Sequence, residues 1–383
     1  MAGFGFTEAQ EMFRRQVRTF AQREIAPGAK ERAKDDSLPP ELIKKLGDNG
    51  LLGVNQPEKY GGQPADWISL GITVEEVSRA DFNLSMVPGI VAGASLALML
   101  GEEPVQMEWI PPLLAGDILP SLATTEPDIG SDVSRLKARA VREGDHYILD
   151  GEKTSISLGM QAAFCLVFAR TGTTAGSRGV SCFIVPTSYP GVSRSRLPDM
   201  GCKPMGRASL VMDGVKLPAR YLLGEEGRGF PLVMRQFDLI RINLGLMTLG
   251  IAQTSLEDAI NYARERTAFG QPIAKYEGVS FKIAEGATML EAARMLSYRA
   301  LWLRDQGLDH TKESAMCKWL SPKVAFRVIH DALLIHGHVG YSEEFPLEQR
   351  LRDVIGWEMA DGTAEIMKII ISRELMGREF LPY

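Results

Sequence analysis

The sequence has few cysteines, and they form no recognisable pair. The 383 residues contain four, at positions 165, 182, 202 and 317. Disulfide frameworks and structural zinc sites need cysteines at short or regular spacings, so the sequence favours neither and indicates a reducing compartment. His336 and His338 lie close together, but Glu343 and Glu344 are the only carboxylates near them. This is a poor ligand set for a metal, and we expect no metal site.

Positive charge, a signal-peptide pattern and a long apolar run are also lacking. The net charge is −5 at pH 7 and the basic residues are scattered, which argues against nucleic-acid binding. The first residues show neither a basic region nor an apolar core of a signal peptide. The longest apolar run, 85–100, is interrupted by Pro88, Gly89 and Gly93 and is too short to cross a bilayer. We expect a cytoplasmic protein that binds neither nucleic acid nor membrane.

Helical and strand-forming patterns divide the chain into three parts. We predict an N-terminal α-helical domain over 1–118, a middle antiparallel β domain over 119–225 and a C-terminal helical domain over 226–383. The fold class is therefore mostly α with a central β-barrel or sandwich. Predicted helices include 67–79, 84–100, 232–264, 276–305 and 313–337. Predicted strands include 136–141, 147–149, 163–169, 179–185 and 208–212.

One carboxylate near the C-terminus is a candidate catalytic base. Asp361 follows an apolar approach from Trp357 and precedes Gly362-Thr363, where we expect the last helix to begin. A desolvated carboxylate has a raised pKa and is a better base near neutral pH. Asp is also a favoured N-cap residue, and its oxygen would then accept the N–H group of Ala364 or so. The two roles are compatible, and the segment alone favours the cap.

Two other segments have the chemistry of a phosphate or ring site. Residues 124–132 combine small hydroxyls with a Gly-Ser turn, which suits a phosphate or a heteroaromatic ring but also an ordinary loop. Arg266 lies at an expected helix end and is followed by Phe269 and Gly270. An Arg there can fork onto a diphosphate, or it can simply answer the helix dipole.

These segments and the order of helices, β domain and long helices resemble the acyl-CoA dehydrogenase family over essentially the whole chain. The matching segments are TTEPDIGSD at 124–132, GEKTSIS at 151–157, ERTAFGQPI at 265–273, HGHVGY at 336–341 and ADGT at 360–363. The resemblance implies a C-terminal four-helix bundle, bound FAD, an acyl-CoA substrate and a homotetramer. It also implies an electron-transfer flavoprotein as the electron acceptor.

The resemblance also assigns site residues. In the family, a carboxylate at the position of Asp361 removes the α-proton of the thioester while flavin N5 accepts the β-hydride. The thioester carbonyl accepts hydrogen bonds from the flavin ribityl chain and from the backbone at or near Thr363. The expected flavin-binding residues are Thr124, Thr125, Ser131, Ser155, Ser157, Arg266, Phe269, Gln271, Gly337, Thr363 and Glu365. The expected substrate-binding residues are Ser131, Asp238, Arg241 and Gly362.

The base itself departs from the family pattern. Most members have Glu where this chain has Asp361, and Asp places its oxygens about 1 to 1.5 Å closer to the main chain. A misplacement of that size can cost about 100-fold in rate. Members that act on cyclohexane- or cyclohexene-carbonyl-CoA resemble this chain at the base position, so an alicyclic thioester is one candidate substrate. Asp81 would then be a second acid or base, although capping a helix from Phe82 is the simpler role.

Two other functions are compatible with the sequence. The thioester carrier can be an acyl carrier protein in a biosynthetic pathway rather than CoA. The chain can also be a helical scaffold or binding protein that has lost catalysis. Ser155 in place of the family's usual Trp, and Leu334 in place of Gln, favour this last alternative. The carboxylate of Asp361 argues against it, and Ile240 offers no carboxylate at the alternative position that some members use.

Overall fold

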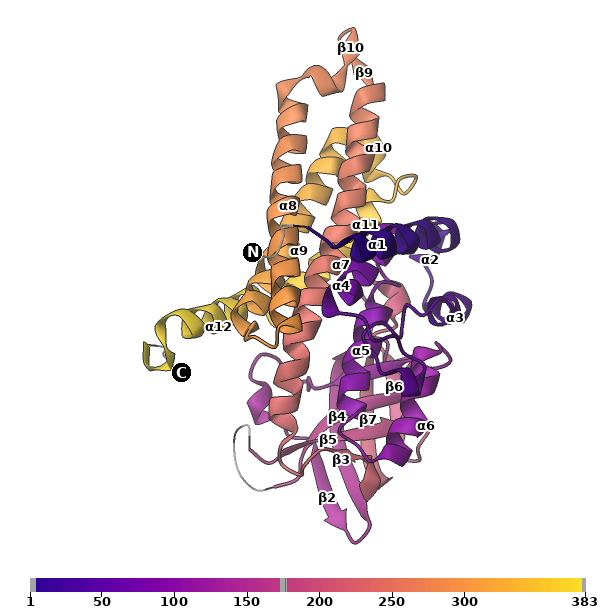
Figure 1. Cartoon of the computed structure of the whole chain (residues 1–383), viewed down its shortest axis with the longest axis vertical. Coiled ribbons are helices and arrows are strands. Elements are labelled where there is room, and N and C mark those ends of the chain that lie inside the picture. Colours follow the sequence, from indigo (N-terminus) through magenta and orange to yellow (C-terminus); the bar gives the residue numbers. More distant parts are fainter. Residues whose placement is uncertain (1–4, 173–175, 177, 381–383) are drawn as a thin grey trace.

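A computed structural model describes residues 5–172, 176 and 178–380 of the chain (Figure 1). The N-terminal part contains the helices α1 (Glu8–Phe20), α2 (Ala29–Arg32), α3 (Pro40–Asp48), α4 (Trp67–Ala80), α5 (Met86–Leu98) and α6 (Glu103–Leu114). The Thr7 side chain accepts the N–H of Gln10, and the Gln10 side chain accepts the N–H of Thr7. This capping box fixes the start of α1. Helix α5 is almost entirely buried, in agreement with the apolar run that predicts it.

The middle part is a sheet of eight strands. They are β1 (Pro120–Ala123), β2 (Arg139–Glu143), β3 (His146–Ile156), β4 (Phe164–Arg170), β5 (Val180–Pro186), β6 (Val192–Arg196), β7 (Ala208–Pro218) and β8 (Leu222–Leu223). Their order is β6-β7-β3-β2-β4-β5-β8, and β1 pairs with β4. Most pairs are antiparallel, as expected, but β1 runs parallel to β4. A parallel pair needs a long crossover, which residues 124–163 provide.

The C-terminal part is built from long helices, as the sequence predicts. Helices α7 (Gly229–Glu265), α8 (Glu277–Asp305) and α9 (Thr311–His336) pack against one another. The shorter helices α11 (Leu347–Ile355) and α12 (Ala364–Met376) pack on α9, and the single turn α10 (His338–Tyr341) contacts α9 and α11. Helices α7 and α8 extend beyond the rest of the molecule and are joined by the strands β9 (Thr267–Ala268) and β10 (Gln271–Pro272) (Figure 1).

One helix of the described chain, α7, is long and apolar enough to cross a bilayer. In this structure, however, 83% of its most apolar window is buried inside the molecule. It runs along α9, α4 and α5, and its N-terminal part also contacts β5. A central helix of a packed core satisfies the same criteria of length and composition. Helix α7 therefore connects the sheet to the helical bundle.

The start of the last helix differs from the prediction. Helix α12 begins at Ala364, and Thr363 is its N-cap, with the Thr363 hydroxyl accepting the N–H of Ile366. Asp361 instead lies in the left-handed region with φ 54°. Asp tolerates this conformation better than most residues, and Gly362 follows with φ 108°. The prediction that Asp361 is the N-cap is therefore wrong, because Thr363 takes that position and frees the carboxylate.

Candidate active site

The side chain of Asp361 is half-buried in a turn between the short helix η7 (Gly356–Glu358) and α12. Its backbone carbonyl accepts a hydrogen bond from Nε of Arg241 on α7, over 3.2 Å. Its carboxylate makes no hydrogen bond or close ion pair with any residue that the structure describes. Burial raises the pKa of the Asp361 carboxyl, and the charges of Lys318 and Arg241 oppose that rise. An unpaired carboxylate with a raised pKa is suited to accept a proton.

Arg241 and Asp238, both expected substrate-binding residues, lie together on α7 beside this turn. Nη1 of Arg241 is 3.6 Å from Oδ1 of Asp238, and Oδ2 of Asp238 accepts the hydroxyl of Thr311 over 2.9 Å. The Arg241 side chain is buried, which lowers its pKa, and its guanidinium lies over the Phe237 ring. The arrangement places a fixed cation against the backbone of the candidate base.

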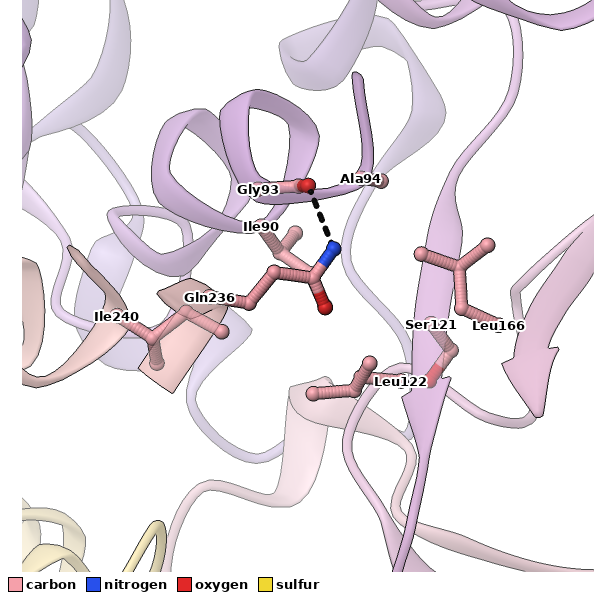
Figure 2. A pocket seen from close by; sticks show the side chains of 8 residues that line it. All are labelled: Ile90, Gly93, Ala94, Ser121, Leu122, Leu166, Gln236 and Ile240. Carbon is pink, nitrogen blue, oxygen red and sulfur yellow. Dashed lines mark hydrogen bonds between the residues drawn. The ribbon is translucent and has the colours of Figure 1, made fainter. Parts of the chain in front are cut away.

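A small apolar cavity adjoins the same stretch of α7 (Figure 2). Its volume is about 10 Å³, close to the space that one water occupies. It is lined by residues of α5, β1, β4 and α7: Ile90, Gly93, Ala94, Ser121, Leu122, Leu166, Gln236 and Ile240. Ile240 directly precedes Arg241, and β1 leads into Thr124-Thr125. The cavity therefore lies between two predicted parts of the site.

Gln236 is a cavity residue that sequence reasoning missed. Its side chain is buried, and its Nε2 donates to the carbonyl of Gly93 over 3.1 Å. Its Oε1 has no hydrogen-bond partner within the described chain. The sequence carries no signal for it, because Arg235, Asp238 and Asn243 lie close by on the same helix and only the structure shows that Oε1 of Gln236 is buried and unpaired.

The segment after β1 is held by a buried ion pair that the motifs alone did not indicate. Nζ of Lys153 on β3 lies 2.8 Å from Oε1 of Glu126 and donates to the carbonyl of Thr124. Glu126 also accepts the backbone N–H groups of Lys137 and Ala138. The hydroxyl of Thr124 is buried and has no partner among the described residues. The fixed loop thus presents an unsatisfied hydroxyl.

Other predicted flavin residues lie on the loop itself or at the end of β3 that is hydrogen-bonded to it. The carbonyl of Thr125 accepts the N–H of Thr154, which ties the loop to the end of β3 where Ser155 and Ser157 follow. Ser155 is exposed and has φ 57°, and Ser157 is half-buried. Ser131 is exposed on the loop after β1. One end of the sheet therefore gathers the hydroxyl residues.

A second group of predicted flavin residues lies elsewhere. Arg266 ends α7, and Gln271 pairs with Ala268 in the hairpin that joins α7 to α8. Phe269, at the tip of the hairpin, is 95% exposed. Figure 1 shows this hairpin at the opposite end of the long helices from the sheet. A single copy of the chain does not bring the two groups together.

The end of α9 and the start of α12 carry the remaining predicted residues. Gly337 ends α9 with φ 64° and ψ −141°, a conformation restricted to glycine. Gly362 has φ 108°, a conformation that residues with a Cβ atom rarely adopt, so this position also favours glycine. Thr363 caps α12, and the Glu365 side chain is exposed in its first turn. None of these side chains pairs with the Asp361 carboxylate.

The histidine pair of the sequence forms no metal site in the described part of the chain, where no group of three potential ligands is found. His336 is buried at the end of α9 and stacks on Tyr262 with ring centroids 4.3 Å apart. Its Nδ1 lies 2.8 Å from the carbonyl of Ala332. His336 is therefore a packed core residue.

Asp81 has a different environment from the one predicted. Helix α5 begins at Met86, so Asp81 does not cap a helix that starts at Phe82. Instead, its Oδ1 accepts the N–H groups of Asn83 and Leu84 in the turn after α4, and its Oδ2 accepts Nε and Nη2 of Arg32. The turn at 82–85 delays the helix because Asp81 satisfies its N–H groups. The carboxylate is fully occupied by these contacts.

Comparison with known proteins gives matches over nearly the whole chain. The models of the N-terminal, middle and C-terminal domains of acyl-CoA dehydrogenases match residues 7–117, 121–215 and 227–376. An acyl-CoA dehydrogenase of Bacillus subtilis is 38% identical over 97% of this chain and 99% of its own length.

Solved structures give the same picture. Butyryl-CoA dehydrogenase from Megasphaera elsdenii has a TM-score of 0.94 and 32% identity, over 98% of this chain and 100% of that one. A glutaryl-CoA dehydrogenase from Mycobacterium smegmatis in complex with FADH2 has a TM-score of 0.91 and 25% identity, over 97% of this chain and 96% of that one.

Proposed function

The chain belongs to the acyl-CoA dehydrogenase family of FAD-dependent oxidoreductases, and we propose that it desaturates a thioester at the α and β carbons with Asp361 as the base. One observation carries the proposal. Asp361 offers a half-buried carboxylate with no hydrogen-bond partner in the described chain, while its backbone is held by Arg241. A structural carboxylate would normally be paired.

The residues present fit the cofactor of the family. The buried hydroxyl of Thr124 lacks a partner in the described structure, on a loop that Lys153 and Glu126 hold rigid. A ring edge with hydrogen-bonding atoms would satisfy that hydroxyl. Thr124, Thr125, Ser155 and Ser157 would hold the ring end of FAD. Bound FAD would supply the acceptor for the β-hydride.

The remaining chemistry is assigned to residues of this chain. The Asp361 carboxylate takes the α-proton. The N–H groups of Gly362 and Thr363 donate no hydrogen bond within the described structure, so one of them can donate to the thioester carbonyl as negative charge develops there. Arg241 keeps the turn in place through the carbonyl of Asp361. The proton transfer thus occurs beside preorganised donors.

An alicyclic acyl group is the substrate class that we propose within this reaction. The short Asp side chain requires a closer approach of the α-carbon, and the family resemblance links an Asp at this position to ring thioesters. The cavity between α5 and α7 is about 10 Å³, so a ring needs its partly buried side chains Ile90, Leu122 and Ile240 to turn. On Gly93, a Cβ atom would lie no closer than 3.9 Å to Ile240 and would project into this space.

Two assembly features complete the proposal. The separation of Arg266, Phe269 and Gln271 from the sheet supports an oligomer in which one copy completes the flavin site of another, and the family resemblance favours a homotetramer. The electron acceptor implied by that resemblance is an electron-transfer flavoprotein. Light scattering of the purified protein, with and without FAD, tests the first feature.

The proposed reaction is tested by anaerobic bleaching of the flavin absorbance near 450 nm. The panel contains cyclohexanecarbonyl-CoA, cyclohex-1-enecarbonyl-CoA, butyryl-CoA and octanoyl-CoA, together with cyclohexanecarbonyl thioester on an acyl carrier protein. We expect bleaching by a ring thioester of CoA and a loss of at least about 10-fold in Gly93→Leu, because the added side chain fills the cavity.

Each other outcome points to a different function. Bleaching by straight chains only would overturn the alicyclic class but keep the desaturation. Bleaching by the carrier-protein thioester alone would identify a biosynthetic enzyme. A protein that stays colourless after incubation with FAD would favour a non-catalytic scaffold.

A further inference from the structure

A buried lysine lies behind the candidate base. Lys318, on α9, is 1% exposed. Its Nζ donates to the carbonyl of Trp357 over 2.7 Å and lies 3.5 Å from the carbonyl of Glu358. Both carbonyls belong to η7, directly before the turn that contains Asp361. The ammonium therefore holds the backbone that leads into the base.

The charge of Lys318 has no contact partner of opposite sign. No carboxylate of the described chain lies within 4 Å of its Nζ, although most buried lysines are paired. Backbone carbonyls satisfy its donors but leave the charge uncompensated. The acidic groups that act on it are Asp361 and Glu358, and Asp361 has the larger effect. The strongest electrostatic interaction of Lys318 with an acidic group is therefore with the Asp361 carboxylate.

The other charged groups around this pair come from each neighbouring element. Arg241 on α7 acts on both Lys318 and Asp361, and Asp238 on the same helix partly balances Arg241. Arg373 on α12 also acts on Arg241. Arg241 and Lys318 therefore give Asp361 two cations on different helices. Arg241 shares its charge with Asp238, whereas Lys318 does not have such a partner in the described chain.

Resting on the proposed function, we propose that Lys318 is a positioning residue for the base: it anchors the turn at 357–361 and supplies a charge that favours the ionised form of Asp361. A lysine that only tied down the Trp357 carbonyl would need no charge. A neutral donor would do the same without the cost of burying an ammonium. The geometry instead places a buried ammonium on the carbonyls that lead into the turn of an otherwise unpaired carboxylate, and its charge favours the form of Asp361 that can accept a proton.

This role predicts how each protonation state affects activity. Burial lowers the pKa of Lys318 to about 8, so about half of the ammonium has lost its charge at that pH. As Lys318 becomes neutral, its hydrogen bonds to the carbonyls of Trp357 and Glu358 lose their charge assistance, and the anchor of the turn weakens. Turnover should therefore have an acidic limb that reports Asp361 and an alkaline decline that includes Lys318.

The first test does not depend on any substrate. The difference in thermal stability between wild type and Asp361→Asn is measured from pH 4.5 to 8.5, and the same pair is measured in a Lys318→Met background. The pH dependence of that difference reports the pKa of Asp361 in the folded protein. We expect its midpoint to move up by about one pH unit or more when the cation is removed. An unchanged midpoint would overturn the assigned role.

The second test uses the holoenzyme and the most active thioester of the panel. The rate of flavin bleaching is measured from pH 5.5 to 9.5 for wild type, Lys318→Met and Lys318→Arg. Arg327→Met, which removes an exposed cation of the same helix, is the control. In Lys318→Met the acidic limb should move to higher pH, with about a 10-fold lower rate at pH 7. A loss of rate that is equal at every pH would mean that Lys318 acts only on structure.

Lys318→Arg keeps the proposal testable if Lys318→Met does not fold. Arginine stays charged throughout this range, so the acidic limb should remain in place while the alkaline decline near pH 8 weakens. An alkaline decline identical to that of wild type would contradict a contribution from Lys318. If wild type bleaches with no thioester, the proposed function fails, but the stability measurement still decides whether Lys318 and Asp361 are coupled.

Discussion

Asp81 and Asp361 are two aspartates whose pKa burial raises, yet their surroundings differ. The carboxylate of Asp81 accepts two backbone N–H groups and two N–H groups of Arg32. That of Asp361 accepts none from the described chain, and its cations act from a distance. Burial alone therefore does not identify a base. A carboxylate with every acceptor occupied holds a turn, whereas one left unpaired can take a proton.

A third buried aspartate, Asp353, has a raised pKa like the other two but is held by hydrogen bonds without a contacting cation. Oδ1 of Asp353 accepts the N–H of Cys202 over 2.6 Å, and Oδ2 accepts the side-chain amides of Asn83 and Gln349. Burial raises the pKa of Asp353 to about 6 in spite of these bonds, because no cation is in contact with it. Asp353 joins α11 to the N-terminal and middle parts. Its hydrogen bonds thus give Asp353 a structural role, although burial raises its pKa.

Among variants that keep a carboxylate at position 361, lengthening the side chain should have a large effect. Asp361→Glu moves the carboxylate about 1 to 1.5 Å outward, which should lower the bleaching rate with a ring thioester by about 100-fold. Glu also tolerates the φ of 54° at this position less well than Asp. The rate is measured by rapid mixing under anaerobic conditions. An unchanged rate with ring thioesters would show that the length of Asp361 does not set the acyl class.

Asp81→Asn tests the structural side of the comparison. The amide keeps one acceptor for the turn but loses the charge that pairs with Arg32, so we expect a loss of about 2 kcal/mol in the free energy of unfolding. Bleaching by thioesters should stay within about 10-fold of wild type, since Asp81 would not take part in proton transfer. Denaturant unfolding and rapid mixing measure the two effects. A rate loss without a stability loss would restore Asp81 as a second acid or base.

The third prediction concerns Asp353 and the pH dependence of stability. Its folded pKa of about 6 lies above the unfolded value, so the folded state holds the proton more tightly between about pH 4 and 6. Wild type should therefore lose stability as pH rises through this window, by at most about 1.4 kcal/mol per pH unit, and lose no more above it. In Asp353→Asn this contribution should vanish. A stability difference between the two proteins that is constant from pH 4.5 to 7.5 would contradict the raised pKa.

The sequence predicted the fold class and the long helices closely, because their apolar periodicity is set by local residues and extends over many turns. It predicted less well where a helix begins. Asp361 and Thr363 are equally plausible caps in Asp-Gly-Thr, and only the left-handed turn at Asp361 decides between them. The same holds for Asp81, whose bonds to Asn83 and Leu84 create a turn before α5.

The candidate site was also only partly predictable from the sequence. The resemblance named Asp361, Asp238 and Arg241, and the structure places them together. Lys318 and Gln236 were not found, because each lies on a mostly apolar helix and its partners are backbone carbonyls of distant segments. Such contacts leave no pattern in one sequence. They depend on how α9 and α7 pack against the elements around them.

The most direct test of Asp361 as the base compares single-turnover flavin bleaching in Asp361→Asn and Asp81→Asn, each loaded with FAD. The thioester is the most active one of the panel. Asp361→Asn should bleach about 1,000-fold more slowly than wild type, because the amide cannot accept the α-proton, while Asp81→Asn stays within about 10-fold. Bleaching by Asp361→Asn within 10-fold of wild type would show that another group is the base.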